Sequence, residues 1–592
     1  MIVPMKKATV IAQAKDAPDA LVKLRSLGIM HVEHQKQPRG EDIAVLKEDL
    51  ALANRAIEIL SAPEFLKQKQ TQQKQAPIDW QFIAKHLMDL YKRLIHLEEY
   101  ALTLRAQVAQ WQPWGDFDPA QIEALRQKGI YIGLYEVPLK EIKTLPAGLI
   151  ARQIYASAGV GYYLLIARQE IKVSFGEIPL PKMGLEDIRK RLYEDGRMMA
   201  IIRDDICKYL AYLGGFKAIK AQLVKKIEFS EALRGMGQIE SFVYLRGFIP
   251  FDKAILLEKT AARENWGFLI EEPSAEDVVP TLIRNPRWVA LIRPVFRLLE
   301  IIPGYRELDI SPVFLLFLSL FFGMIIGDAG YGALYFLLTF LLQKKFSRRA
   351  KDQRVFFLFY LFSACAIFWG LITGTVFGQD WYLAAGFKPI IPILNDLKFL
   401  QAFCFFLGAL HLTLAHAMQG IRKMPSLAAL TDLGWIILLW SGFFIARTLI
   451  LDATYPAFVN KMIISGIALV VIFSSPQKNI LKMLAKGLGT LALSLMNNFT
   501  DVVSYVRIFA VGLAGVTISN TVNALAAGFG DNFLLKALIL FLGHSINMVL
   551  GPMSVLVHGV RLNVLEFSGH AGLSWSGVSY KPLEDLNEER SL

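Results

Sequence analysis

Apolar positions follow two regimes along the chain, and the change between them falls near residue 300. Before that point, helical stretches carry apolar residues three and four positions apart, as in amphipathic helices of soluble proteins. After it, apolar residues form long uninterrupted runs, and a membrane-spanning helix needs about 20 of them. The pattern predicts a soluble part over residues 1–300 and a membrane part over residues 301–592.

The apolar runs of the second half predict eight transmembrane helices. The first two share the stretch from Ser311 to Gln343, whose only formal charge is Asp328 in GMIIGDAGYG. Glycines around Asp328 permit a tight reversal there, and one long helix is the competing interpretation. The predicted spans cover residues 311–326, 330–346, 354–377, 397–420, 432–451, 460–474, 495–528 and 534–567.

The last two predicted spans are longer than an upright helix needs. Each covers 34 residues. At about 1.5 Å per residue this is about 50 Å, against a hydrocarbon core of about 30 Å. We therefore expect both helices to be steeply tilted.

Charge between the spans predicts their orientation. The connections 344–354, 421–431 and 478–486 hold 11 Lys and Arg in total, and the alternate connections hold 5. Positive residues favour the cytoplasmic side. The first residues, MIVPMKKATVIAQAK, carry no apolar signal segment. We therefore expect the N-terminal domain and the C-terminus to be cytoplasmic.

The soluble half reads as lobes and a rod. Strand and helix patterns alternate over residues 7–34 and again over Ile239 to Pro273, and residues 129–173 read as strands. We expect α/β lobes near residues 1–40 with 129–180 and near 239–275, joined by a helical rod over 41–112 and 183–235. The predicted fold is an α+β domain with an antiparallel coiled-coil rod, followed by an all-α membrane domain.

Two apolar seams support the rod, because their spacing suits helices that pack along their length. A third helical region, Leu185 to Ile227, is long enough to return beside them. The first seam is Ile43, Leu46, Leu50, Ala53, Ile57 and Leu60, and the second is Ile83, Leu87, Leu90, Leu94, Leu97, Ala101, Leu104, Val108 and Trp111.

Composition excludes several classes of function. The net charge of +12 comes from basic residues that gather between the spans and form no nucleic-acid-binding motif. The three cysteines are scattered, and His411 and His416 lie five residues apart, so neither set has metal-ligand spacing. We expect both histidines to be hydrogen-bonded bundle residues. We expect no cofactor, and the lack of a GxxxxGK[ST] loop argues against ATP hydrolysis by this chain.

Two arginines lie inside the apolar runs of the last two spans, Arg507 in DVVSYVRIFAVGLAGVTISN and Arg561 in GPMSVLVHGVRLNVLEF. A charge at the centre of a bilayer costs roughly 3 kcal/mol on translocon scales, so such residues usually belong to an ion pathway or a buried ion pair. Polar residues share a helix face with each of them. The candidate ion-translocation residues are Arg507, Arg561, Asp501, Ser504, His558, Glu566, Asn547, Ser554 and Asn497.

Each arginine has a structural alternative. Arg561 and Glu566 lie within about two turns of the helix end, where Arg561 can extend to the cytoplasmic interface and Glu566 can cap it. Arg507 lies too deep for that, and its alternative is an ion pair with Asp501 or Glu566. We expect Asp328 to be a loop residue.

The chain resembles subunit I of the bacterial and archaeal V-type (A-type) rotary ATPases, the counterpart of eukaryotic subunit a. The resemblance covers essentially the whole length. It departs at Gly515, where eukaryotic relatives carry histidine, and at Gly551, where relatives carry glutamate. The motifs that carry it are GFIP at 247–250, VPTLIRNP before the membrane part, FFGMIIGDAGYG at 321–332, SYVRIFAVGLA at 504–514, and VHGVRLNVLEF followed by YKPLED.

The resemblance implies a stator subunit with two ion half-channels, in which Arg507 is the essential arginine facing carboxylates of a rotor ring and Arg561 is its partner. It implies an integral, multi-pass protein of a prokaryotic plasma membrane that couples transport of H⁺ or Na⁺ to rotation. The implied partners are rotor-ring subunits of c or K type, peripheral-stalk subunits of E or G type bound to the rod, a central-stalk subunit of d or C type docked on the ring, and the lipid bilayer.

A stand-alone secondary transporter with a regulatory cytoplasmic domain is the second hypothesis. The sequence argues against it, because no inverted repeat and no matching pair of broken helices is visible.

Overall fold

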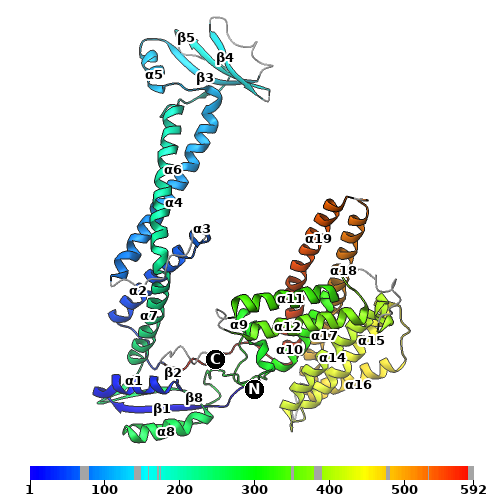
Figure 1. Ribbon diagram of the computed structural model, residues 1–592. Coiled ribbons are helices and arrows are strands. Elements are labelled where there is room, and N and C mark those ends of the chain that lie inside the picture. Colours follow the sequence, from blue (N-terminus) through cyan, green and yellow to red (C-terminus); the bar gives the residue numbers. More distant parts are fainter. Residues whose placement is uncertain are drawn as a thin grey trace. The chain divides into compact units, whose positions relative to one another are not determined.

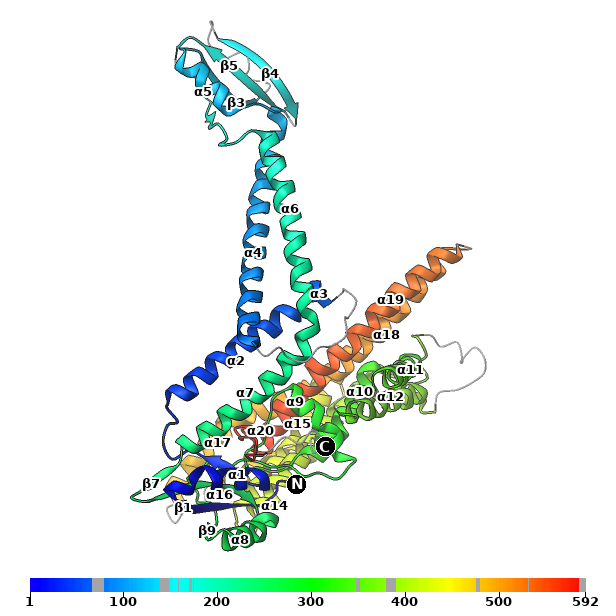
Figure 2. The same cartoon turned by 60° about the vertical axis from the view of Figure 1, so that its left-hand side comes forward.

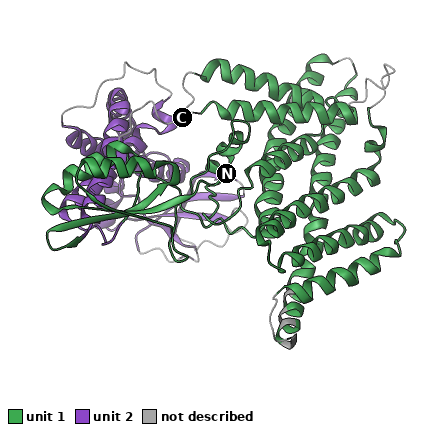
Figure 3. Cartoon of the chain, turned by 90° about the horizontal axis from the view of Figure 1, so that it is seen from below, with its two compact units in different colours: residues 1–33, 238–592 green, residues 34–237 purple. Residues whose placement is uncertain are grey.

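The protein is described by a computed structural model (Figure 1). It divides into two compact units, residues 34–237 and residues 1–33 with 238–592 (Figure 3). The predicted soluble and membrane parts, with their boundary at residue 300, stay a prediction. The residues that the structure describes are 1–66, 79–138, 149–157, 159–169, 173, 175–347, 352–378, 390–474, 480–530 and 532–584.

The N-terminal strand belongs to a sheet built from both ends of the predicted soluble part. The strand order is β2-β8-β1-β9, all neighbours are antiparallel, and a short β7 pairs with β8. Each strand–helix–strand unit is therefore split by a strand of the other. The elements are β1 (Met5–Gln13), α1 (Ala17–Leu27), β2 (His31–Glu33), β7 (Gly237–Ile239), β8 (Phe242–Pro250), α8 (Ala254–Arg263) and β9 (Gly267–Glu271).

This sheet corrects the predicted grouping of residues 1–40 with 129–180. The two strand–helix–strand patterns were found, but β1 lies between β8 and β9, with Val10 opposite Leu245 and Phe268. Residues 131–178 instead form their own sheet in the order β4-β5-β3-β6. The reason is that the local alternation of apolar residues identifies a strand and its two faces, but not the distant strand that pairs with it.

The helices of the unit 34–237 lie in two pairs, α4 with α6 and α2 with α7 (Figure 1, Figure 2). Ala53, Leu87 and Leu94 from the predicted seams are buried among them. The third helical region is two helices, because a short 3₁₀ turn at Tyr209–Tyr212 interrupts it. The coiled coil itself stays a prediction. The elements are α2 (Glu41–Leu60), α3 (Pro63–Leu66), α4 (Trp80–Trp111), α5 (Pro119–Gln127), β3 (Tyr131–Pro138), β4 (Ile150–Ser157), β5 (Val160–Ala167), β6 (Glu177–Ile178), α6 (Leu185–Lys208) and α7 (Leu213–Arg234).

The second half is helical. Among the described residues, five helices are long and apolar enough to cross a membrane, or up to six when a bent pair is counted as one span. A further apolar helix, α16, has 16 residues. Eight spans and their tilt therefore stay a prediction. The helices are α9 (Arg293–Leu298), α10 (Ser311–Ile326), α11 (Ala329–Phe346), α12 (Arg354–Thr373), α14 (Leu397–Lys423), α15 (Ala429–Leu451), α16 (Phe458–Phe473), α17 (Ile480–Ser504), α18 (Val506–Ala527), α19 (Phe533–Ser554) and α20 (Ser568–His570).

The predicted break after the first apolar run is present. The chain bends by 120° between α10 and α11, and Gly327 at the bend has a φ of 63°. Asp328 is more than a loop residue, because it is buried and caps α11. Its carboxylate accepts hydrogen bonds from the backbone N–H groups of Tyr331 at 3.0 Å and Gly378 at 2.8 Å.

The predicted basic connections between the spans agree only in part with the structure. The connection 478–486 is helical from Ile480 onward, because α17 begins there and carries its lysines on the first turns. Parts of the basic connections fall on residues 348–351 and 475–479, which lie outside the described residues. The last two apolar stretches are long, as predicted, with helical segments of 41 and 38 residues over Gly487–Ala527 and Phe533–His570.

The last described residues return to the N-terminal sheet. The N–H of Thr281 donates to the carbonyl of Val578 at 2.7 Å, and the N–H of Leu583 donates to Met30 at 2.9 Å. The hydroxyl of Tyr580 donates to the carbonyl of Ile29 at 2.5 Å. The C-terminal segment is therefore bonded to the residues that lead into β2 of this sheet.

Candidate functional site

Arg507 lies in the first turn of α18, just after the short break at Tyr505 between α17 and α18. Tyr505 is fully buried, and its hydroxyl is 2.7 Å from Nδ1 of His411, which fixes the break. The Nε of Arg507 donates to the carbonyl of Ser504 at 2.9 Å. This bond ties the Arg507 side chain to the end of α17.

The Arg507 guanidinium forms an ion pair with Glu566. Of the two side chains, Glu566 is 6% exposed and Arg507 is 23% exposed. The second carboxylate oxygen of Glu566 is buried without a hydrogen-bond partner among the described residues. Of the structural alternatives for Arg507, the pair with Glu566 is present, and the guanidinium still keeps part of its surface open.

Arg561 reaches the same carboxylate, with its Nε 3.7 Å from Oε1 of Glu566. Residues five apart on an α-helix do not share a face. Here the helix is π-helical over Leu562–Phe567 and over Val555–Gly559, and the wider i→i+5 turn brings the two side chains together. The Arg561 side chain is 56% exposed and lies beside Glu566, and its place at the cytoplasmic interface stays a prediction.

A chain of acids and histidines lies on the α17 side of Arg507. Asp501 Oδ2 is 3.0 Å from Nε2 of His570, and Nδ1 of His570 is 2.9 Å from Nε2 of His416. His416 Nδ1 is 3.2 Å from Asp432, which also accepts from Lys423 Nζ at 2.8 Å. We call Asp501, His570, His416, Asp432 and Lys423 the acid–histidine cluster.

The acid–histidine cluster lines a cavity of about 440 Å³. Glu566 also lines it, together with Asn497 and other polar residues from α14, α15 and α17. A polar cavity of this size holds water, because its walls offer many hydrogen-bond partners. Among the described residues, no group of three or more His, Cys, Asp and Glu is placed to hold a metal ion.

A second polar group lies on the other side of Arg507 along α18. The Nδ2 of Asn547 donates to the carbonyl of Gly515 at 2.9 Å and to the hydroxyl of Ser519 at 2.8 Å. The Tyr331 hydroxyl is 2.6 Å from Nδ1 of His544 and 2.8 Å from the Ser519 hydroxyl. His544 Nε2 is 3.1 Å from Oδ1 of Asn523. We call Tyr331, Ser519, Asn523, His544 and Asn547 the amide–hydroxyl cluster.

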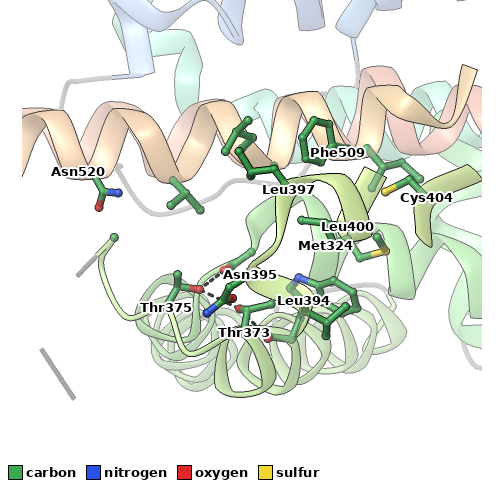
Figure 4. Close-up of a pocket in the computed structure, with 17 residues that line it drawn as sticks. Met324, Thr373, Thr375, Leu394, Asn395, Leu397, Leu400, Cys404, Phe509 and Asn520 are labelled. Atoms are coloured by element: carbon green, nitrogen blue, oxygen red, sulfur yellow. Dashed lines mark hydrogen bonds between the residues drawn. The ribbon is translucent and has the colours of Figure 1, made fainter. Parts of the chain in front are cut away.

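A cavity of about 250 Å³ opens beside α18 near this second cluster (Figure 4). Thr373 and Thr375 line it with their hydroxyls 3.1 Å apart, and the Asn395 side chain lies next to them. Asn520 of α18 lies at the opposite wall. Apolar side chains such as Met324 and Phe509 line the rest.

The structure brings together most of the candidate residues. Arg507, Arg561 and Glu566 meet, and Asp501 and Asn497 line the cavity beside them. The Ser504 hydroxyl bonds the Asp501 carbonyl at 2.7 Å. Asn547 and Ser554 line a separate, smaller cavity of about 130 Å³.

Sequence reasoning missed His570, Asp432, Lys423, Tyr331 and His544. His416 was expected to be a hydrogen-bonded bundle residue, which it is, but its partners are other ionisable groups. His411 fits the expectation more closely, since it is buried and its Nδ1 lies 2.7 Å from the hydroxyl of Tyr505. Tyr331 and His544 had one sequence signal, their position as polar residues in apolar runs, whereas Lys423, Asp432 and His570 lie at or beyond the ends of the predicted spans.

The comparisons place this chain among known proteins. It is 30% identical to V-type ATP synthase subunit I 1 of Treponema pallidum (strain Nichols), over 99% of this chain and 100% of that protein. It is 28% identical to V-type ATP synthase subunit I of Borreliella burgdorferi, over 99% and 100%.

Other comparisons add less. No protein-family model matches. A crystal structure of the cytoplasmic N-terminal domain of subunit I, homolog of subunit a, of V-ATPase aligns with 45% of this chain and 99% of its own, at 13% identity and a TM-score of 0.22, which is too low to carry an argument. The full-length matches are sufficient by themselves: the chain belongs to the V-type ATP synthase subunit I family, the membrane subunits of rotary ATPases.

Proposed function

We propose that this subunit is the stator of its rotary ATPase, and that Arg507 separates two ion half-channels at the contact with a ring of rotor carboxylates. The observation that carries the proposal is the charge of the arginine site. Arg507 and Arg561 converge on one carboxylate, Glu566, and leave one positive charge uncompensated. A carboxylate of a moving partner would balance that charge.

The positions of the two polar clusters support two separate paths. The acid–histidine cluster precedes Arg507 along α17, and the amide–hydroxyl cluster follows it along α18. The first cluster lines the cavity of about 440 Å³, and Tyr331 and Asn547 of the second line the cavity of about 130 Å³. An ion that enters through one path can leave through the other only by moving with the rotor, because the guanidinium stands between them.

Arg507 then has two roles in our mechanism. Its fixed positive charge stabilises the ionised rotor carboxylate, which favours release of the bound ion. It also blocks direct passage of cations between the cavities. Each elementary charge that leaks through 100 mV wastes about 2.3 kcal/mol, so this barrier preserves coupling.

The predicted topology places the acid–histidine cluster at the cytoplasmic end. Lys423 ends α14 in the connection 421–431, which the positive-inside rule assigns to the cytoplasm. Arg422 beside it bonds the carbonyl of Arg306, in the segment that leads from the N-terminal sheet. We therefore assign the cavity of this cluster to the cytoplasmic half-channel.

We propose that the unit 34–237 anchors a peripheral stalk. Its sheet ends in β4, an edge strand that is exposed along its whole length. Ile150, Ile154 and Tyr155 on this strand present apolar surface. An exposed edge strand is a ready template for another chain.

The test of the proposed function is Arg507→Ala in the assembled complex, with ATP-driven ion uptake and ATPase activity measured on the same vesicles. We expect loss of ion uptake, and Arg507→Lys should rescue little because lysine differs in hydration and pKa. Coupled pumping by the alanine variant would refute the proposal.

A double variant that removes both members of the Arg507–Glu566 pair tests whether the pair serves transport or only folding. If Arg507 and Glu566 form only a structural pair, Arg507→Leu with Glu566→Leu should restore both folding and pumping, because apolar residues can replace a buried pair. We expect folding without pumping.

The alternative of a stand-alone transporter is tested by reconstituting the purified subunit by itself. Solute transport by the isolated subunit would support that alternative and refute the stator.

A further inference from the structure

Five arginines gather where the segment before the membrane helices meets the start of α12. Four of them, Arg284, Arg287, Arg293 and Arg354, line a cavity of about 580 Å³. Among the residues that the structure describes, no Asp or Glu lines this cavity. The fifth, Arg297, lies beside it and pairs with Asp352 at 3.3 Å.

The internal partners of these arginines do not neutralise them. Arg284 pairs with Asp252 at 2.8 Å, and the Nε of Arg354 is 3.9 Å from Asp352, the carboxylate that Arg297 also uses. Arg287 makes no ion pair within the described part of the chain. Five positive charges therefore face two carboxylates, an excess of three.

The neighbouring positive charges also act on Arg293, which is partly buried. Burial lowers the pKa of Arg293, and the charges of Arg354 and Arg297 lower it further. Its guanidinium donates to the carbonyl of Ile283 at 2.6 Å, which supplies no counter-charge. A further donor, the side-chain N–H₂ of Asn285 in the cavity wall, is buried without a hydrogen-bond partner among the described residues.

Apolar surface continues from this cavity along the outside of α12. Trp288 and Phe357 in the cavity wall are 61% and 53% exposed. Phe368 and Leu371 follow Phe357 by 11 and 14 residues, so they lie on the same helix face, and both are exposed. A basic pocket at one end of an exposed apolar stripe suits a ligand that has both an anionic group and hydrocarbon chains.

From this geometry we propose that the cavity binds the phosphodiester headgroup of an anionic phospholipid, with its acyl chains along the Phe357, Phe368 and Leu371 face of α12. Guanidinium groups suit phosphate because their N–H groups match its oxygens in pairs. A basic pocket at the cytoplasmic ends of spanning helices is a favourable place for such lipids. The exposed tryptophan suits the membrane interface as well.

The test uses the full chain in nanodiscs of phosphatidylcholine with or without phosphatidylglycerol, and counts retained lipid by native mass spectrometry. We expect selective retention of phosphatidylglycerol, weakened about tenfold in Arg287→Gln with Arg354→Gln. The control is Lys344→Gln with Lys345→Gln, which removes the same charge from exposed positions at the end of α11. This control should retain the lipid.

Three results would overturn the proposal. The first is an equal loss of lipid in both double variants, and the second is no preference of the wild-type chain for phosphatidylglycerol. The third is a rise in melting temperature with inorganic phosphate that equals the rise with phosphatidylglycerol. The last would identify a site for a soluble anion. A second measurement needs no variant. Phosphatidylglycerol should protect Arg287 and Arg354 of the wild-type chain from phenylglyoxal, and phosphatidylcholine should not; equal modification in both lipids would contradict the assignment.

Discussion

The two polar clusters beside Arg507 differ in the chemistry of their side chains. The acid–histidine cluster joins two carboxylates, two imidazoles and an ammonium group in a row of contacts between 2.8 and 3.2 Å. The amide–hydroxyl cluster joins a tyrosine, a serine, two amides and one imidazole. The first can hold and exchange charge, whereas the second offers mainly dipoles.

Because of this difference, losing a side chain from one cluster should destabilise the apolar bundle more than losing one from the other. A buried ion pair that loses one partner leaves a bare charge, whereas a neutral group that loses one partner leaves only an unmade hydrogen bond. Substitutions in the two clusters should therefore lower the free energy of unfolding by different amounts.

The largest effect should come from Glu566→Leu, which leaves Arg507 and Arg561 without their shared carboxylate. We expect a loss of about 3 kcal/mol in the free energy of unfolding, measured by chemical denaturation in mild detergent. Leu565→Ala is the control, because Leu565 is exposed on the preceding position. An equal loss in both variants would show that the carboxylate does not hold the arginines.

Within the acid–histidine cluster, Asp432→Asn should cost about 2 kcal/mol. The carboxylate accepts from both Lys423 and His416, and the amide weakens both charge-assisted bonds. Asp452→Asn, an exposed position at the other end of α15, should change unfolding little. Comparable losses at the two positions would remove the distinction between a buried ionic cluster and a surface acid.

The amide–hydroxyl cluster should lose less. Asn547→Leu removes the donor to Gly515 and Ser519 but leaves no charge exposed, so we expect a loss of about 1.5 kcal/mol by the same measurement. Met548→Leu, next on the helix, is the control for apolar substitution. A loss larger than that of Asp432→Asn would reverse the proposed ranking.

The smallest stability effect should come from His570→Asn, about 1 kcal/mol, because an amide keeps one hydrogen bond to Asp501. Its effect on transport should be larger. If protons pass through this cluster, the variant slows ATP-driven proton uptake, and imidazole added to the buffer restores part of it. Unchanged uptake would exclude the imidazole as a relay, and His411→Asn, outside the cluster, should gain nothing from imidazole.

Sequence patterns predicted the apolar helices well because each helix carries its own signal. The break at Gly327 and Asp328 followed from glycines and a charge in an apolar run, and the structure has it. Burial of Asp328 did not follow, because the N–H of Gly378, which completes its bonding, lies 50 residues away.

Contacts between distant segments were harder to predict. His416 in α14 and His570 in α20 are 154 residues apart, and five α-helices lie between them along the chain. The partner strands of β1 were wrongly grouped for the same reason. The meeting of Arg561 and Glu566 depends on π-helical turns, which leave no periodic signature in the residues.

The return of the C-terminal segment to the N-terminal sheet has a consequence for biosynthesis. Met30 and Ile29 leave the ribosome among the first residues, yet their partners, Leu583 and Tyr580, leave it after every apolar helix has been made. The sheet thus lacks these C-terminal contacts while the helices are inserted. A chain truncated before Tyr580 would lose these contacts and leave the surface around Ile29 and Met30 open to cellular proteases.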